Sequence, residues 1–267
     1  VQLNHAGRLA RDALPERVGP SAKSIKKALD GSELLPCREL TSNDLDRIVG
    51  EFAAAAVRAK KSGVDMVMIH GAHGYLLSQF LSPVYNGPRS DEYGSQNLEN
   101  RARLLLRVIK AVREAVGVDF PIAVKLNTSD FRPEGMTVSE STQIVQWLAD
   151  SGVCLVEASG GSAVSEFSPI RNKKDGPEGY HMEGAQAWKQ ALKGREGIAV
   201  GMVGGIRCGE TANKFVTEGI CDIVSMSRPF IREPNLVEKW EKDLSYKSKC
   251  ASCCLCIKNV HLGQGFC

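Results

Sequence analysis

Apolar residues along this chain follow two alternating patterns, short continuous runs and longer stretches with helical spacing. The runs are typical of strands buried on both faces, and they cover residues 64–69, 120–126, 153–158, 198–203 and 222–226. Apolar residues three or four positions apart predict helices from about 41 up to Gly63, over 98–116, from a capping box at Thr137–Glu140, around 183–193, over 209–218 and from about 234. Strands that alternate with helices predict an α/β fold with a parallel sheet.

The number of strands bears on the architecture. Residues 1–3 read as one more strand, so six strands are expected, in either a (β/α)₈ TIM barrel or an open doubly wound sheet. No strand is followed by Gly-x-Gly-x-x-Gly or Gly-x-x-x-x-Gly-Lys, the nucleotide-binding patterns of open sheets, and this favours the barrel. Because a barrel closes with eight strands and the chain starts inside a strand, we expect about six of eight βα units, with two N-terminal units absent from this sequence. Residues 1–245 are then an N-terminally incomplete barrel domain, followed by a cysteine-rich C-terminal tail over 246–267.

Composition narrows the function classes. With 267 residues, 43% of them hydrophobic and 24% charged, the chain is long enough for one large α/β domain. Its net charge of +3 is scattered and forms no basic stripe, so we expect no nucleic-acid partner. No apolar run reaches the roughly 18 residues of a membrane helix, so we expect a cytoplasmic protein without a membrane partner. Composition does not indicate the oligomeric state.

A cluster of aromatic and imidazole side chains follows the strand over 64–69. His70, His73 and Tyr75 lie within six residues that also contain Gly71 and Gly74. Glycines predict a bending loop here, and the carboxyl ends of strands are where α/β enzymes carry their chemistry. We therefore expect the two imidazoles and the phenol to converge on one small molecule. The alternatives are a zinc site, although no Glu or Cys lies at ligand spacing, and simple packing of the tyrosine in the core.

The last two strands suggest a phosphate site. Gly204 and Gly205 follow one strand just ahead of a helix, and Ser227 and Arg228 follow the next. In (β/α)₈ enzymes the loops after strands seven and eight commonly hold a phosphate with glycine amides, a helix N-terminus and a cation. The alternative is that the glycines only permit tight turns and the arginine is a surface charge.

Several ordered motifs together resemble the Old Yellow Enzyme family of FMN-dependent ene-reductases, over residues 1 to about 245. The motifs are Gln2-Leu-Asn-His-Ala-Gly-Arg, His70-Gly-Ala-His-Gly-Tyr-Leu-Leu-Ser-Gln-Phe-Leu-Ser-Pro, Arg89-Ser-Asp-Glu-Tyr-Gly, Glu99-Asn-Arg, Val124-Lys-Leu-Asn and Met202-Val-Gly-Gly-Ile. The resemblance implies a TIM barrel in which Gln2 belongs to the third strand. The loop segments over 86–89 and 93–100 each depart from the family pattern by about one extra residue.

The resemblance also implies roles at the flavin. Gln2 would bind the pyrimidine edge of FMN, and Lys125 would lie by N1 and the C2 carbonyl, where a cation stabilises the anionic reduced flavin. Gly204, Gly205 and Arg228 would hold the FMN phosphate, in agreement with the phosphate site read from the residues.

The same resemblance implies a reaction. FMN would take hydride from NAD(P)H and reduce the C=C bond of an α,β-unsaturated carbonyl compound, an enone or enal. His70 and His73 would bind and polarise the carbonyl oxygen. Tyr75 would protonate the α-carbon.

Five cysteines crowd the last eighteen residues. Cys250, Cys253, Cys256 and Cys267 resemble the four-cysteine iron–sulfur ligands of dienoyl-CoA reductases, although the third cysteine comes one residue early for that family. A zinc site and a tail of reduced thiols are the other interpretations. We expect reduced thiols and no metal.

Three other interpretations of the whole chain stay open. It could be an inactive flavin-enzyme fragment, an iron–sulfur flavoprotein of the dienoyl-CoA reductase type, or a phosphate-binding aldolase that uses Lys125 as a Schiff-base nucleophile. The aldolase hypothesis leaves the histidines, Tyr75 and Gln2 without a role. We therefore expect the flavin enzyme.

Overall fold

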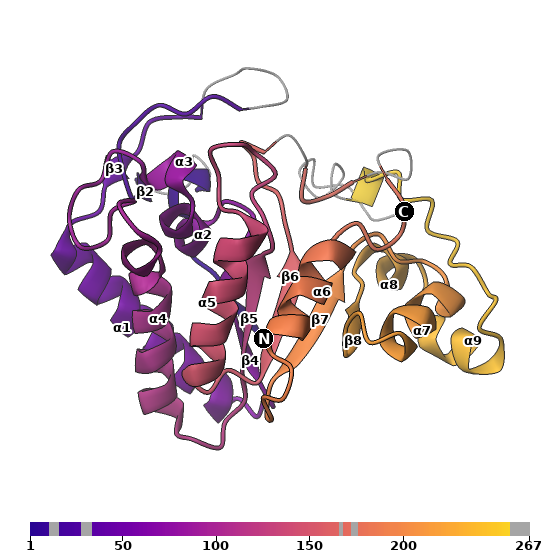
Figure 1. The fold of residues 1–267 in the computed structure, drawn as a ribbon. Coiled ribbons are helices and arrows are strands. Elements are labelled where there is room, and N and C mark those ends of the chain that lie inside the picture. Colours follow the sequence, from indigo (N-terminus) through magenta and orange to yellow (C-terminus); the bar gives the residue numbers. More distant parts are fainter. Residues whose placement is uncertain (11–15, 28–33, 166–167, 172–175, 257–267) are drawn as a thin grey trace.

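Six parallel strands form the main sheet of the computed structural model, which describes residues 1–10, 16–27, 34–165, 168–171 and 176–256 (Figure 1). The strands are β1 (Gln2–Leu3), β4 (Val67–Gly71), β5 (Ile122–Asn127), β6 (Leu155–Ser159), β7 (Ala199–Val203) and β8 (Ile223–Ser225). They pair in chain order, β1-β4-β5-β6-β7-β8. Strands that neighbour in sequence and in space, each reached through a helix, are the βα units of a (β/α)₈ barrel, and the predicted fold class is confirmed. Within the described residues β1 and β8 end the sheet and do not pair with each other.

Helices follow the strands as the apolar spacing predicted. They are α1 (Ser42–Lys61), α4 (Leu98–Val116), α5 (Val138–Asp150), α6 (Met182–Ala191), α7 (Gly209–Thr217) and α9 (Leu236–Lys242). The capping box predicted at Thr137 is present, since its hydroxyl accepts from the Glu140 backbone and the Glu140 carboxylate accepts in return. Helix α1 begins with the same motif at Thr41 and Asp44. These local signals explain why helix starts agree with the sequence to within one or two residues.

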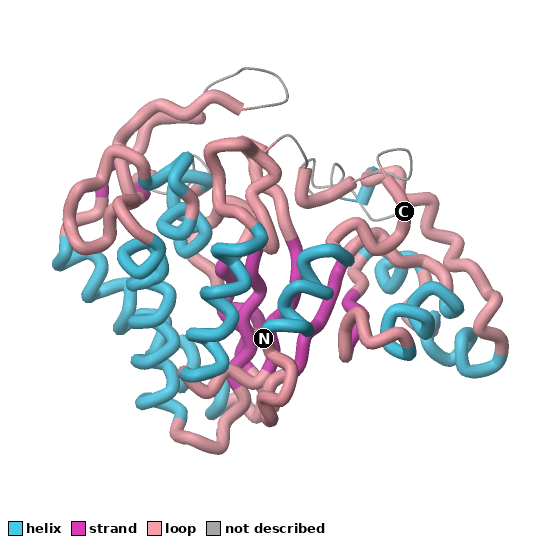
Figure 2. The backbone as a smooth tube through the Cα atoms, viewed as in Figure 1, coloured by secondary structure: helices cyan, strands magenta, loops and turns pink. Residues whose placement is uncertain are grey.

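Short elements were not predicted. They are the 3₁₀ turn η1 (Gly7–Leu9), the two-stranded sheet of β2 (Val18–Gly19) and β3 (Arg38–Glu39), and the helices α2 (Leu76–Leu81), α3 (Pro83–Asn86) and α8 (Arg228–Arg232). Segments of two to six residues are too short to show a period, so tertiary contacts determine them. Figure 2 shows most of the long connections gathered on one side of the main sheet.

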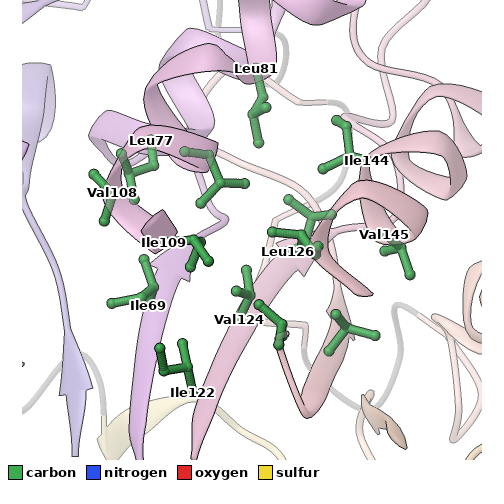
Figure 3. Close-up of a cluster of buried hydrophobic side chains, with 14 of the residues drawn as sticks. Ile69, Leu77, Leu81, Val108, Ile109, Ile122, Val124, Leu126, Ile144 and Val145 are labelled. Atoms are coloured by element: carbon green, nitrogen blue, oxygen red, sulfur yellow. The ribbon is translucent and has the colours of Figure 1, made fainter. Parts of the chain in front are cut away.

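One face of the sheet is covered by helices and forms the core (Figure 3). Ile69, Val124 and Val156 occupy adjacent register positions on this face and are fully buried. They belong to one cluster with Leu77, Leu81, Val108, Ile109, Ile122, Leu126, Ile144 and Val145. Because side chains alternate along a strand, the intervening residues face the other side, which in a barrel is the interior. His70, Lys125 and Glu157 form one such row across three strands.

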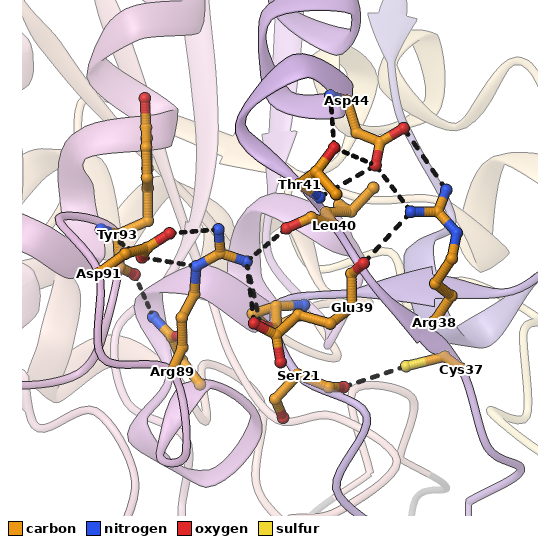
Figure 4. A network of polar contacts seen from close by, with 12 residues as sticks. Ser21, Cys37, Arg38, Glu39, Leu40, Thr41, Asp44, Arg89, Asp91 and Tyr93 are labelled. Atoms are coloured by element: carbon orange, nitrogen blue, oxygen red, sulfur yellow. Dashed lines mark hydrogen bonds and ion pairs between the residues drawn. The ribbon is translucent and has the colours of Figure 1, made fainter.

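Arg89 connects the small sheet to the loop before α4 (Figure 4). Its buried guanidinium donates to the Leu40 carbonyl at 2.8 Å and the Pro20 carbonyl at 3.2 Å, and it binds Asp91 through two nitrogens at 2.7 and 2.6 Å. A bidentate arginine pair is both strong and directional. This contact therefore holds the backbone at Pro20 and Leu40, next to the two short strands, against the loop before α4.

The last described residues are held against α8 and α9 by Glu233. This buried carboxylate accepts hydrogen bonds from Lys239 Nζ, Tyr246 Oη, Ser248 Oγ and the backbone N–H of Lys249, all at 2.6 to 2.8 Å. Burial opposes ionisation, but the hydrogen bonds outweigh it and lower the pKa of Glu233 to about 2. The start of the cysteine-rich tail is thus anchored. In the part of the chain that the structure describes, no helix combines the length and apolar character needed to cross a membrane.

Candidate active site

His70, His73 and Tyr75 come together at the carboxyl end of β4. The ring of His70 lies 5.1 Å from that of His73 and 5.0 Å from that of Tyr75, and both contacts are edge-on. The turn that allows this needs left-handed backbone, at His73 with φ +63° and at Gly74 with φ +76°. A Cβ on Gly74 would lie 2.6 Å from the Tyr85 hydroxyl oxygen, so no larger residue fits there. The predicted convergence of the three rings is observed.

His70 is a neutral imidazole with a defined proton position. Its Nδ1 accepts the backbone N–H of Ala72 at 3.2 Å, so the proton of the neutral ring is on Nε2. Burial, and then the nearby charge of Lys125, lower the pKa of His70 to about 4. The ring is therefore an N–H donor without a charge near neutral pH.

Two residues from neighbouring strands hold His73. Its backbone N–H donates to Asn127 Oδ1 at 3.1 Å, and its Nε2 lies 2.6 Å from Ser159 Oγ. Burial, followed by His70 and Lys125, holds the pKa of His73 well below its ordinary value. Asn127 ends the Val124-Lys-Leu-Asn motif but was given no role from the sequence, and Ser159 was not singled out; they stand 54 and 86 residues from His73.

Lys125 lies beside His70 in the register of β4 and β5, and Glu157 lies beside Lys125 in the register of β5 and β6. The ammonium and the carboxylate form an ion pair whose side chains are only 13% and 10% exposed. Ser225 Oγ donates to the second carboxylate oxygen at 2.7 Å. Glu157 was missed in the sequence; the available signal was a single acid inside the apolar run over 153–158.

A cavity of about 250 Å³ opens between these residues and the ends of β7 and β8. His73, Lys125 and Ser159 line it together with residues of the predicted phosphate site, Gly205, Ser227 and Arg228. A larger groove of about 730 Å³ lies on the outer surface between α4 and α5 and is lined by residues such as Arg107, Lys110 and Trp147. None of the candidate catalytic residues at the strand ends lines that groove, so the larger of the two cavities is not the candidate active site.

The predicted phosphate residues fit an anionic ligand. Gly205 has φ +69°, and a Cβ there would lie 2.9 Å from the Tyr180 ring, so only glycine leaves this backbone bare. The Gly204 carbonyl accepts from the backbone N–H of Gly179 at 2.6 Å, which fixes the loop. Arg228 Nη1 donates to the Arg171 carbonyl at 2.7 Å and to Cys254 Sγ at 3.1 Å, and these two hydrogen bonds fix the orientation of the guanidinium.

Gln2 does not line this cavity within the described structure. It pairs with Met68 in the register of β1 and β4, and its Nε2 donates to Met68 Sδ at 3.0 Å. Since Met68 and His70 are two positions apart on β4, Gln2 faces the same side of the sheet as His70 and Lys125. The Gln2 side chain is exposed at the edge of the sheet.

His181 is a third imidazole near the site, and the sequence carried no signal for it. It precedes α6, is 4% exposed, and its ring contacts those of Tyr180 and Phe131 at centroid distances of 4.7 and 5.8 Å. Neither ring nitrogen has a hydrogen-bond partner among the described residues. Burial, then Lys125 and Arg171, lower the pKa of His181 to about 3.

The described cysteines do not assemble a metal site. Within the described residues, no three His, Cys, Asp or Glu side chains are grouped so that they could hold a metal ion. Cys250, Cys253 and Cys256 are free thiols, and Cys267 lies outside the described residues.

A TIM barrel with a cationic, glycine-bordered cavity beside two neutral imidazoles indicates an enzyme of the class that binds a phosphorylated ligand at its strand ends. Comparison with known proteins identifies the group: the chain belongs to the NADH:flavin oxidoreductase / NADH oxidase family, whose model matches residues 1–247. The family resemblance seen in the sequence is confirmed. FMN is the cofactor of this family, and NAD(P)H is the reductant that its members' names give.

Curated relatives and solved structures agree with this assignment. NADPH dehydrogenase of Geobacillus thermodenitrificans (strain NG80-2) is 37% identical and matches 92% of this chain and 67% of its own length. NADH oxidase of Thermoanaerobacter brockii is 35% identical, and the match covers 95% of this chain and 38% of the NADH oxidase. A 2-naphthoyl-CoA reductase complex superposes with a TM-score of 0.82 at 26% identity over 94% of this chain and 39% of that one. Histamine dehydrogenase from Rhizobium sp. 4-9 superposes with a TM-score of 0.70 at 27% sequence identity, over 90% of this chain and 34% of that one.

The chain thus spans 67% of one NADPH dehydrogenase and only 38% of the NADH oxidase. The residues present nevertheless fit FMN, because Lys125, Arg228 and the bare backbone at Gly205 all border one cavity. These residues would hold the flavin edge and the phosphate.

Proposed function

We propose that this protein is an FMN-dependent oxidoreductase that takes hydride from NAD(P)H and reduces the C=C bond of an enone or enal. The observation that carries the proposal is the pair of neutral imidazoles, His70 buried and His73 partly buried, with the Tyr75 ring 5.0 Å from that of His70. Family membership and the NADPH dehydrogenase relatives support the redox chemistry. Bound FMN would supply the hydride.

His70 and His73 would bind the carbonyl oxygen of the substrate. Two neutral N–H donors stabilise negative charge that develops on this oxygen as the β-carbon is reduced, and such donors act strongly where water is excluded. His70 is buried, and a charged imidazole would cost more in this setting than a neutral one. Low pKa values at both histidines support donors that do not change charge during turnover.

Tyr75 would donate the proton to the α-carbon. It stands at the N-cap position of α2 with its ring against His70, so the same turn that presents the imidazoles presents the phenol. A phenol is protonated at neutral pH and can act as a general acid within hydrogen-bond reach. Lys125 would contact the pyrimidine edge of the flavin, and its ion pair with Glu157 would hold the ammonium in place.

The test separates the two half-reactions. Tyr75→Phe is expected to leave flavin reduction by NADPH unchanged and to slow reoxidation by 2-cyclohexenone about 10²- to 10⁴-fold, as followed by flavin absorbance in a stopped-flow instrument. The matched control is Tyr93→Phe, which removes the hydroxyl of a buried tyrosine that accepts a hydrogen bond from Arg107 on α4. Equal loss in both half-reactions would contradict the proton-donor role. Failure of the purified protein to bind FMN would contradict the flavin proposal as a whole.

A further inference from the structure

Ser159 contacts the imidazole of His73 from the end of β6. Its Oγ lies 2.6 Å from His73 Nε2, and its side chain is buried. The register of β5 and β6 fixes the position of Ser159, and its carbonyl accepts the backbone N–H of Thr128 at 2.8 Å. The hydroxyl is therefore placed by the sheet itself and not by a loop.

The backbone of His73 is held independently by Asn127. The N–H of His73, in its left-handed conformation, donates to Asn127 Oδ1 at 3.1 Å. Asn127 is fully buried, and its amide reaches Asp130 Oδ1 at 3.3 Å. With the backbone fixed from one side and Nε2 from another, the imidazole has little freedom to turn.

The direction of the Ser159–His73 hydrogen bond follows from the number of protons available. A serine hydroxyl can donate one proton or accept, and a neutral imidazole has one N–H and one bare nitrogen. Among the described residues, His73 is the sole partner of the Ser159 hydroxyl. If His73 donated, the buried serine proton would have no acceptor among the described residues, and an unpaired buried donor is costly. Ser159 therefore donates to Nε2, and the His73 proton is on Nδ1.

His70 has the opposite arrangement. Its Nδ1 accepts the Ala72 N–H, so its own proton is on Nε2. We propose that Ser159 is a positioning residue that fixes the Nδ1–H tautomer of His73, so that the site presents one N–H from each imidazole, of opposite tautomers, to a single acceptor oxygen. That this oxygen is a substrate carbonyl rests on the proposed function; the tautomer assignment does not.

The direct test is NMR on the full chain labelled with ¹⁵N-histidine. Long-range ¹H–¹⁵N spectra distinguish the two nitrogens, and loss of the signal in His73→Asn assigns it among the five histidines of the sequence. We expect Nδ1 of His73 to be protonated in the native protein. In Ser159→Ala we expect a shift toward the Nε2–H form, and in Ser159→Thr, which keeps the hydroxyl, the native form.

Ser165→Ala is the matched control. It removes another buried hydroxyl, 3.0 Å from Ser162 Oγ, without touching His73, and should leave the His73 signal unchanged. A native His73 with the proton on Nε2, or an unchanged tautomer in Ser159→Ala, would overturn the proposal.

A kinetic readout separates this inference from the proposed function. Ser159→Ala should lower kcat/KM for 2-cyclohexenone about 10- to 100-fold, and Ser159→Thr should restore it. Expected tautomers without any enone reduction would support the positioning role and reject the enone proposal. Enone reduction that Ser159→Ala leaves intact would overturn the positioning role.

Discussion

Breaking the Lys125–Glu157 pair should destabilise the protein by an amount that depends on pH. Lys125→Met leaves a carboxylate that is 10% exposed, and among the described residues Ser225 is then its only donor. Removing one partner of a buried pair costs about 3–5 kcal/mol. The loss has an upper limit, because the unpaired carboxylate can take up a proton instead of staying charged. For an ordinary glutamic acid this protonation costs about 3.7 kcal/mol at pH 7 and about 1 kcal/mol at pH 5. We therefore expect a loss of about 3 kcal/mol in the free energy of unfolding at pH 7 and about 1 kcal/mol at pH 5.

Urea unfolding of the native protein and the variant at both pH values measures this difference. Tryptophan fluorescence, to which the fully buried Trp188 of α6 contributes, reports the transition. Lys125→Met combined with Glu157→Gln should regain most of the loss, because no charge is then left unpaired.

Lys189→Met breaks an exposed pair with Asp222, at 33% and 39% exposure, and should cost less than about 1 kcal/mol at both pH values. An equal loss at pH 5 and pH 7 for Lys125→Met, or no recovery in the double variant, would refute the reasoning.

Three further predictions concern the turn, the histidines and the tail. Gly74→Ala should lower Tm and kcat/KM together, and Tyr85→Phe in the same chain should recover part of both, because the Cβ would lie 2.6 Å from the tyrosine oxygen. The pKa values of His70 and His181 are lowered to about 4 and about 3, below the ordinary 6.5, so the unfolded chain takes up protons before the folded one. The free energy of unfolding should therefore fall as pH drops from 6.5 to 4. His181→Phe should make this fall smaller, as measured by urea midpoints across the pH range. Glu233→Gln should expose residues 246–256 to limited proteolysis at pH 7, and unchanged cleavage would argue against the carboxylate as their anchor.

Much of the fold could be predicted from the sequence, because the patterns that indicate it lie within short stretches of the chain. Apolar runs and helical spacing lie within single elements, and the caps at Thr41 and Thr137 each involve residues three positions apart. The His70–Tyr75 cluster was predictable for the same reason, since all its members lie within six consecutive residues. Glycines on both sides of His73 indicated the bend that brings the rings together.

Other parts of the site depend on strand register, which no single segment encodes. Glu157 is 32 residues from Lys125, yet the register of β5 and β6 sets the two side by side. Ser159 is 86 residues from His73, and the same register places it beside Asn127, which binds the His73 backbone. His181 is similar, because packing against Tyr180 and Phe131 decides its burial. A lone histidine or a lone acid in an apolar run carries no sequence pattern of its own.

The sequence by itself therefore determined the class of fold, the order of the strands and the group of side chains that ends β4. Only the tertiary structure decided the charge and proton positions in that group. Burial sets the protonation of His70 and His73, and a hydrogen bond from Ser159, 86 residues away in the chain, sets the tautomer of His73. Desolvation and hydrogen-bond direction are properties of the packed molecule, and they arise only when the strands pair.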